Sequence, residues 1–154
     1  MIKEALLVLF ERDLKKLKTE IAAYPSPAVL WQTVPGIANS GGNLCLHLVG
    51  NLRHFIGHVL GGTGYQRNRP AEFETTGLPA ETLLKDIDDT ISELHSTISG
   101  LNDAALEAVY PQKVFDADMQ TGYFLLHLLG HLDYHLGQIN YHRRITSASS
   151  QSLG

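Results

Sequence analysis

The residues His127-Leu-Leu-Gly-His131-Leu-Asp-Tyr-His135 identify the last long helix of the chain, which is predicted over residues 121–144. They contain two overlapping H-x3-H pairs. On a helix, residues four apart lie on one face about 6 Å apart along the axis, close enough to hold one ion. His127 and His135 lie about 12 Å apart along the axis and are rotated by about 80°, so the three do not easily share an ion. His131 belongs to both pairs and is therefore the strongest single candidate for a metal ligand.

A second group of histidines lies on an earlier predicted helix. The chain has 8 histidines, and all but His95 fall into these two groups. His47 and His58 lie about 16 Å apart along a helix, too far to bind the same ion. Spacing leaves two assignments open: His47 with His131 and His135, or His54 and His58 with His127 and His131.

Four segments with helical periodicity predict an all-α fold. Apolar residues recur at three- and four-residue spacing between charged ones, and prolines and glycines mark the ends. The predicted helices cover residues 3–23, 40–60, 79–99 and 121–144. Two long connectors, a polar loop over 61–79 and a second connector over 101–120, favour a four-helix bundle with long crossover connections over simple up-and-down topology. We expect one bundle domain over residues 1–146 and a flexible C-terminal tail over 147–154.

Composition narrows the class of protein. A length of 154 residues suits a single domain, and a formal charge of −4 with dispersed basic residues argues against nucleic-acid binding. The single cysteine, Cys45, lies among apolar residues and is interpreted as a buried structural thiol. We find no signal peptide and no apolar run of membrane-spanning length, so a cytoplasmic protein without membrane association is expected.

Several common sites are excluded by their missing residues. No Glu follows His127 or His131 as in zinc proteases, and residues 61–64 lack the Lys of a P-loop. No Glu-x-x-His pairs occur on two helices, which argues against a ferritin-type di-iron site. A lone histidine on an apolar helix is more often a core residue. Paired histidines on facing helices favour a metal site instead.

Two motifs resemble one known family. The stretch His131-Leu-Asp-Tyr-His135-Leu-Gly137-Gln138 resembles the H-x3-H-x-G-Q signature of the DinB-like superfamily. The segment Asn39-Ser-Gly-Gly-Asn-Leu-Cys-Leu-His47-Leu-Val-Gly-Asn51 is similar to the second-helix motif of the same superfamily. The resemblance covers roughly residues 1–146 and implies a four-helix bundle with one metal bound by three histidines. These are His47, His131 and His135, so the resemblance selects between the two open assignments.

The resemblance also implies a set of functional expectations. Members often bind nickel or zinc, many are homodimers, and characterised relatives include thiol-dependent S-transferases and an isomerase. Three histidine ligands leave coordination positions open for water or substrate, as in catalytic rather than structural sites. We therefore expect a metal-dependent enzyme that acts on a small molecule, either as a hydrolase or as a thiol S-transferase. Its cofactor is expected to be one divalent transition metal. The alternative is a non-enzymatic, stress-related bundle in which the metal is structural.

No catalytic residue is assigned from the sequence. Asn51 and Gln138 each follow a predicted ligand by about one turn and are candidates to contact the ligands or the substrate. For Gln138, a packing hydrogen bond between helices is an equally good interpretation. The remaining histidines are predicted to line the cavity, support the ligands or lie on the surface; these are His54, His58, His127 and His142.

Overall fold

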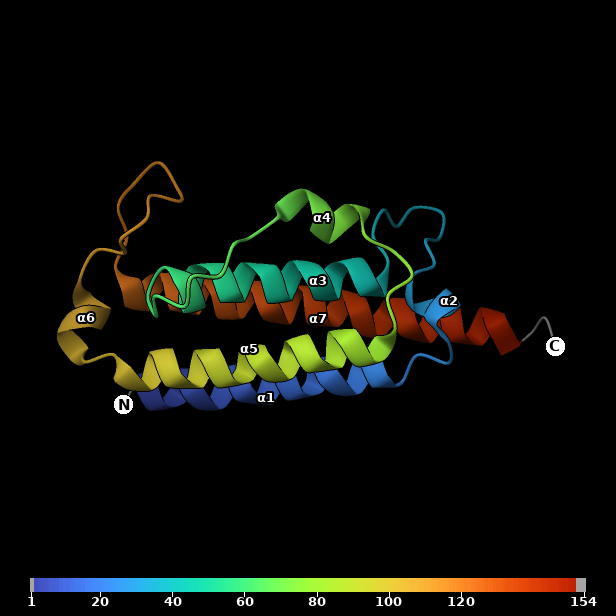
Figure 1. The fold of residues 1–154 in the computed structure, drawn as a ribbon, viewed down its shortest axis with the longest axis horizontal. Coiled ribbons are helices and arrows are strands. Elements are labelled where there is room, and N and C mark those ends of the chain that lie inside the picture. Colours follow the sequence, from blue (N-terminus) through green and yellow to red (C-terminus); the bar gives the residue numbers. More distant parts are fainter. Residues whose placement is uncertain (1, 152–154) are drawn as a thin grey trace.

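The computed structural model describes residues 2–151, with side chains as far as residue 149, and it is built from helices joined by loops (Figure 1). No β-strand forms within that range, and the all-α prediction is confirmed. None of the helices in the described part of the chain is long and apolar enough to cross a membrane.

Four long helices make the bundle and three short ones lie in its connections. The long helices are α1 (Ile2–Ala22), α3 (Gly41–Leu52) continued by the π-helical segment η1 (Arg53–His58), α5 (Ala80–Gly100) and α7 (Thr121–Gln151). The short helices are α2 (Pro27–Leu30), α4 (Arg69–Glu74) and α6 (Asp103–Glu107).

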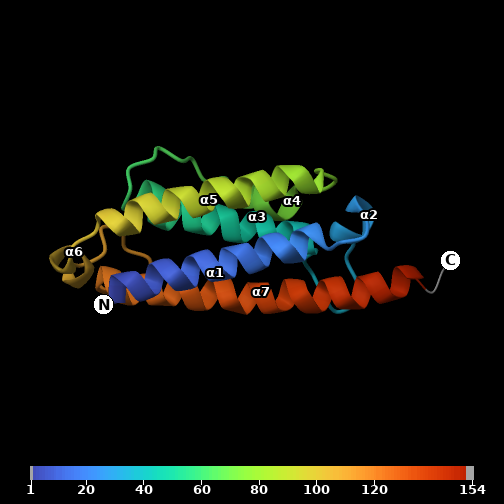
Figure 2. The ribbon, with the colours of Figure 1, turned by 90° about the horizontal axis from the view of Figure 1, so that it is seen from below.

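Each long helix packs beside two others. α1 lies against α5 and α7, and α3 lies against the same two helices (Figures 1 and 2). α1 and α7 run in one direction and α3 and α5 in the other (Figure 1). The connection from η1 to α5 crosses back along the bundle and carries α4 over α3, whereas the other long connector, 101–120, joins helix ends at one end of the bundle (Figure 1). The four-helix bundle therefore contains one true crossover.

The core consists of the apolar stripes predicted from periodicity. On α1 the buried face includes Leu6, Phe10, Leu14, Leu17 and Ile21, each at most 1% exposed. Burying a side chain of this kind contributes roughly 1.5–3 kcal/mol, so each stripe holds its helix in the bundle. Cys45 is fully buried, as predicted, and burial raises the pKa of its thiol.

The second long helix begins as predicted but is not uniform. The Ser40 hydroxyl accepts a hydrogen bond from the backbone N–H of Asn43 at 3.1 Å, which caps α3. From Arg53 the helix widens into a π turn, in which Val59 N–H donates to His54 C=O five residues back. The helix then ends before Gly62, whose φ of +65° favours glycine.

Two local predictions need correction. The segment 61–79 was expected as a polar loop, but it contains α4, which Asn68 caps by accepting a hydrogen bond from Ala71 N–H. The last helix extends beyond the predicted end at Arg144 to Gln151. Thr146 is buried there, and its hydroxyl donates to the carbonyl of His142, so this turn is packed and satisfied. The predicted flexible tail, 147–154, is thus helical as far as 151, and its last three residues lie outside the described residues.

Candidate metal centre

His47 lies in the middle of α3, where the helix is covered on several sides. α7 and α5 pack against it, and α4 covers a further face. The His47 residue is 7% exposed, so a polar ring is held where water barely reaches it. A buried polar group is costly unless it is hydrogen-bonded or ligates a metal, so its partners define the site.

His131 and His135 face His47 from α7. They are one turn apart, with ring centroids 4.5 Å from each other, and both are partly buried. The centroid of the His47 ring lies 5.0 Å from that of His131 and 5.1 Å from that of His135. One nitrogen from each ring falls within 4.8 Å of the others, which is compatible with a single ion between them. The structure thus brings together the three residues selected by the resemblance.

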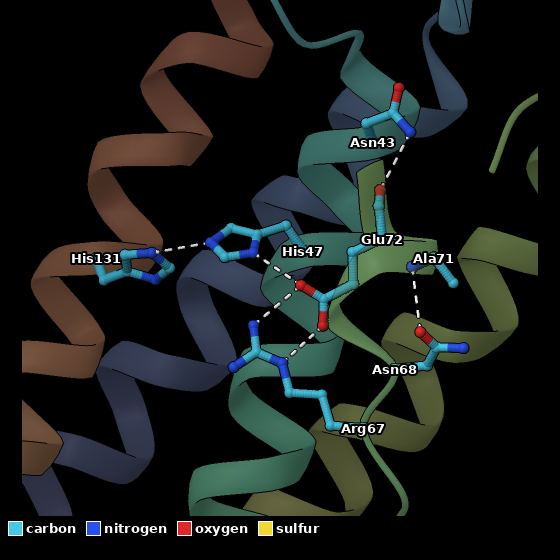
Figure 3. A network of polar contacts seen from close by, with 7 residues as sticks. All are labelled: Asn43, His47, Arg67, Asn68, Ala71, Glu72 and His131. Carbon is cyan, nitrogen blue, oxygen red and sulfur yellow. Dashed lines mark hydrogen bonds and ion pairs between the residues drawn. The ribbon is translucent and has the colours of Figure 1, made fainter. Parts of the chain in front are cut away.

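Glu72 of α4 fixes the proton on the His47 ring. Its Oε2 lies 2.9 Å from His47 Nδ1 (Figure 3). Arg67 donates to the same carboxylate from Nε at 2.6 Å and from Nη2 at 2.9 Å. Burial raises the pKa of Glu72, but the hydrogen bonds from His47 and Arg67 outweigh it and hold the pKa below its ordinary value. A carboxylate accepts only, so His47 Nδ1 carries the hydrogen and Nε2 keeps its lone pair.

Gln138 has the equivalent role for His135. Its amide oxygen lies 2.7 Å from His135 Nδ1, so this nitrogen donates and Nε2 is again left with a lone pair. Gln138 was interpreted either as a contact to a ligand or substrate or as a packing hydrogen bond between helices. The structure shows a contact with His135, a predicted ligand. His131 differs from both: its Nε2 lies 3.2 Å from His47 Nε2, while its buried Nδ1 has no hydrogen-bond partner in the described part of the chain.

The protonation of the site favours metal binding. Burial, with smaller contributions from the neighbouring His135 and His47, lowers the pKa of His131 to about 4. Burial also lowers the pKa of His135. Metal binding requires the neutral imidazole. The rings of His131 and His135 are already neutral near pH 7, so an ion need not displace a proton from them.

Comparison with known proteins places the chain in a family. The sequence profile of the DinB superfamily matches residues 9–139. The chain belongs to the DinB superfamily. The fold is also similar to the crystal structure of a DinB-like protein from Bacillus cereus ATCC 10987, with a TM-score of 0.73 and 16% sequence identity, covering 94% of this chain and 92% of that one. A search of curated proteins finds no match.

The donor set of this DinB superfamily member fits a divalent transition metal. Three imidazoles converge, two of them with Nε2 presented by a hydrogen bond on the opposite nitrogen, which is the usual arrangement of metal-bound histidine. Nitrogen donors of this kind suit zinc, nickel and copper better than magnesium or calcium. Within the described residues, this is the group of His, Cys, Asp and Glu side chains that approaches closely enough to hold an ion.

The other arrangement left open by spacing is not formed. The rings of His54 and His58 stack on each other at 5.8 Å in η1, and His54 Nε2 lies 3.2 Å from Gln112 Oε1. His127 is exposed and stacks on Phe124 at 5.9 Å. The His54 and His58 pair lies within the π-helical segment, beyond the regular helix that carries His47, and neither ring belongs to the three-histidine group.

His142 and Asn51 are both buried. His142 Nε2 donates to the Gln32 carbonyl at 2.8 Å, and its Nδ1 lies 2.7 Å from the Tyr24 hydroxyl, so it ties α7 to the segments that follow α1 and α2. Asn51 was predicted to contact a ligand or the substrate. Its buried Oδ1 has no hydrogen-bond partner among residues 2–149, so this oxygen bonds none of the predicted ligands, and a contact with substrate stays a prediction.

Sequence reasoning missed Glu72 and Arg67. Both lie in the connector predicted as a polar loop, where charged residues are ordinarily solvated. One signal was available: Asn68 followed by Pro70 matches the start of a helix, with an N-cap residue and proline in the first turn. That signal predicts α4, although it does not predict which side chain of α4 points inward.

Proposed function

We propose that the chain is a metal-dependent enzyme in which His47, His131 and His135 hold one nickel or zinc ion. The observation that supports this most directly is the convergence of three imidazoles whose nitrogens lie within 4.8 Å of one another. When bound, such an ion supplies Lewis acidity and lowers the pKa of a water or thiol in its open position. A hydrolase or a thiol S-transferase follows from this chemistry.

A cavity lined in part by α7 residues one to two turns beyond His135 supports a small-molecule substrate. Its volume is about 380 Å³, within the range of ligand pockets. Gln138, which hydrogen-bonds His135, forms part of its wall, whereas none of the three histidines lines it. The wall is mostly apolar, with the amide of Gln138 and the phenol of Tyr141 as groups that can orient a ligand; it is lined by Gly36, Ile37, Ala38, Asn39, Leu44, Gln138, Tyr141 and His142.

The ligands themselves are placed for access. His131 and His135 are partly exposed, and three protein ligands leave room for a further one. A purely structural zinc site usually has four protein ligands and is closed. Partial exposure of two ligands therefore favours catalysis over a structural role.

The proposal is tested first by metal content. Purified protein is analysed for bound metals beside His47→Ala and His131→Ala, and each is titrated with Ni²⁺ or Zn²⁺ while its melting temperature is recorded. We expect one ion per chain in the wild type, little in either variant, and a stabilisation of roughly 2.7 kcal/mol at 100 times the dissociation constant. Wild-type protein that binds no divalent metal above background would refute the proposal.

A structural role is the second candidate, because the ligands join α3 to α7. It predicts a large fall in melting temperature on chelation and no turnover with any thiol. The enzyme proposal predicts turnover in a screen of electrophiles with low-molecular-weight thiols, or hydrolysis without them, which is lost in His131→Ala. The two candidates are therefore separated by activity rather than by metal content.

We also propose that the protein forms a homodimer through α7. Tyr134 and Tyr141 are each 65% exposed and Ile145 is 47% exposed, while Gly137 between the tyrosines leaves room for close approach. A mass of two chains in solution by light scattering, reduced to one by Tyr134→Glu with Tyr141→Glu, is the expected result.

A further inference from the structure

Glu72 is an unusual residue for a short helix in a connection. It is 5% exposed, and carboxylates are rarely buried unless they are paired. Arg67, five residues earlier, forms an ion pair with it, and its side chain is 13% exposed. Two residues so close in sequence could form the same ion pair at the protein surface. Because this pair is buried, the Glu72 carboxylate also contacts His47, which a pair at the surface would not do (Figure 3).

Gly50 provides the space that the Glu72 carboxylate occupies. It lies inside α3, where glycine costs roughly 1 kcal/mol relative to alanine. A Cβ at this position would overlap the Glu72 carboxylate. The helix that carries His47 therefore has a glycine in its interior at the place where α4 inserts its carboxylate.

Asn43 attaches α4 to the same helix from the other side. Its Nδ2 donates to the carbonyl of Glu72 at 3.1 Å and to that of Thr75 at 2.8 Å. Its Oδ1 accepts from the Ser40 hydroxyl at 2.7 Å, so the amide is fixed in turn. Asn43 lies one turn before His47 on α3. The position of Glu72 relative to His47 is thus set by backbone contacts as well as by its own side chain.

We infer that Glu72 is the positioning residue of the metal centre. It holds the hydrogen on His47 Nδ1 and directs Nε2 toward His131, while Arg67 keeps it charged and Gly50 admits it. This inference rests on the proposed metal site, but the orientation of the ring exists without metal. Partners that orient metal-bound histidines typically affect metal affinity by 10- to 100-fold when they are lost.

The test compares two variants with a matched control. Glu72→Met keeps the length of the side chain and removes the acceptor, and Gly50→Ala displaces the carboxylate without removing any polar group. Glu74→Met makes the same change at an exposed position of α4. For each, the tautomer of His47 is read from ring ¹⁵N shifts in metal-free protein, and Zn²⁺ affinity is measured by calorimetry.

We expect the Nδ1–H tautomer of His47 in the wild type and in Glu74→Met. In Glu72→Met and Gly50→Ala, the Nε2–H form should appear and Zn²⁺ should bind on the order of 10- to 100-fold more weakly. An unchanged tautomer or an unchanged affinity in Gly50→Ala overturns the inference, even if Glu72→Met does not fold. If the tautomer responds but the wild type binds no metal, the positioning role stands and the proposed function fails.

Discussion

Acidification in the absence of metal is expected to destabilise the bundle through His131. Burial, together with the nearby His135 and His47, lowers the pKa of His131 from its ordinary value of 6.5 to about 4. In the unfolded chain the ring takes up its proton near pH 6.5, whereas in the folded chain it does so only near pH 4. The unfolded state therefore binds more protons between these values, and stability falls as the pH drops through this window.

The size of the loss follows from the same shift. A tenfold change in proton affinity corresponds to about 1.4 kcal/mol, so the depression of the His131 pKa sets an upper limit of about 3 kcal/mol. The ring is partly exposed, and screening by solvent reduces this to about 1–2 kcal/mol. Below pH 4 this residue contributes no further change, because it is then protonated in both states.

Urea unfolding at pH 7, 6, 5 and 4.5, with a chelator present, measures the effect. His131→Gln is the comparison, since it cannot titrate while every other acid and base remains. The free energy of unfolding of the wild type should fall more steeply than that of the variant, by about 1–2 kcal/mol over the window. Parallel curves for the two proteins would refute the reasoning, because they would show that folding does not depress the pKa of His131.

Three further predictions concern residues outside the proposed ligand set. Tyr24→Phe should lower the free energy of unfolding by about 1–2 kcal/mol in urea, because it leaves the buried Nδ1 of His142 without its donor. His127→Ala should bind Zn²⁺ with unchanged stoichiometry in calorimetry, since His127 is exposed and outside the three-histidine group; a lost site would contradict this. Cys45 should react with a thiol reagent only at the rate of unfolding, because it is fully buried and burial raises its pKa; rapid labelling of folded protein would be inconsistent with the fold.

The long helices could be predicted from the sequence because each carries its own signal. The stripe from Leu6 to Ile21 has helical spacing, and Ser40 caps the next helix as expected. The end of α7 could not be predicted in this way. Residues 147–151 are small or polar, and the helix continues into them after Thr146, which is buried and bonded to the preceding turn. Tertiary packing outweighs weak intrinsic propensity there.

The centre was only partly predictable. Spacing along α7 identified His131, since helix geometry alone places it in both pairs. Spacing does not give the axial position of one helix relative to another, so the pairing with His47 required the resemblance. The inward position of Glu72 could not be predicted from hydrophobic periodicity, because α4 is too short to show a period. Its place is set by Asn43 and Gly50, which lie far from it in sequence. The π turn after Leu52 likewise has no local sequence pattern that predicts it.

The separation of the proposed ligands along the chain has a consequence for biosynthesis. His47 and His131 are 84 positions apart, and the helix that carries His131 follows every other helix of the described residues along the chain. A nascent chain lacks the complete trio until α7 has been synthesised and has docked against α3. An ion met earlier finds only isolated histidines or the pair on α7. If the proposed site binds an ion, the complete trio would therefore be loaded only after assembly, and the apolar core would have to hold the bundle together first.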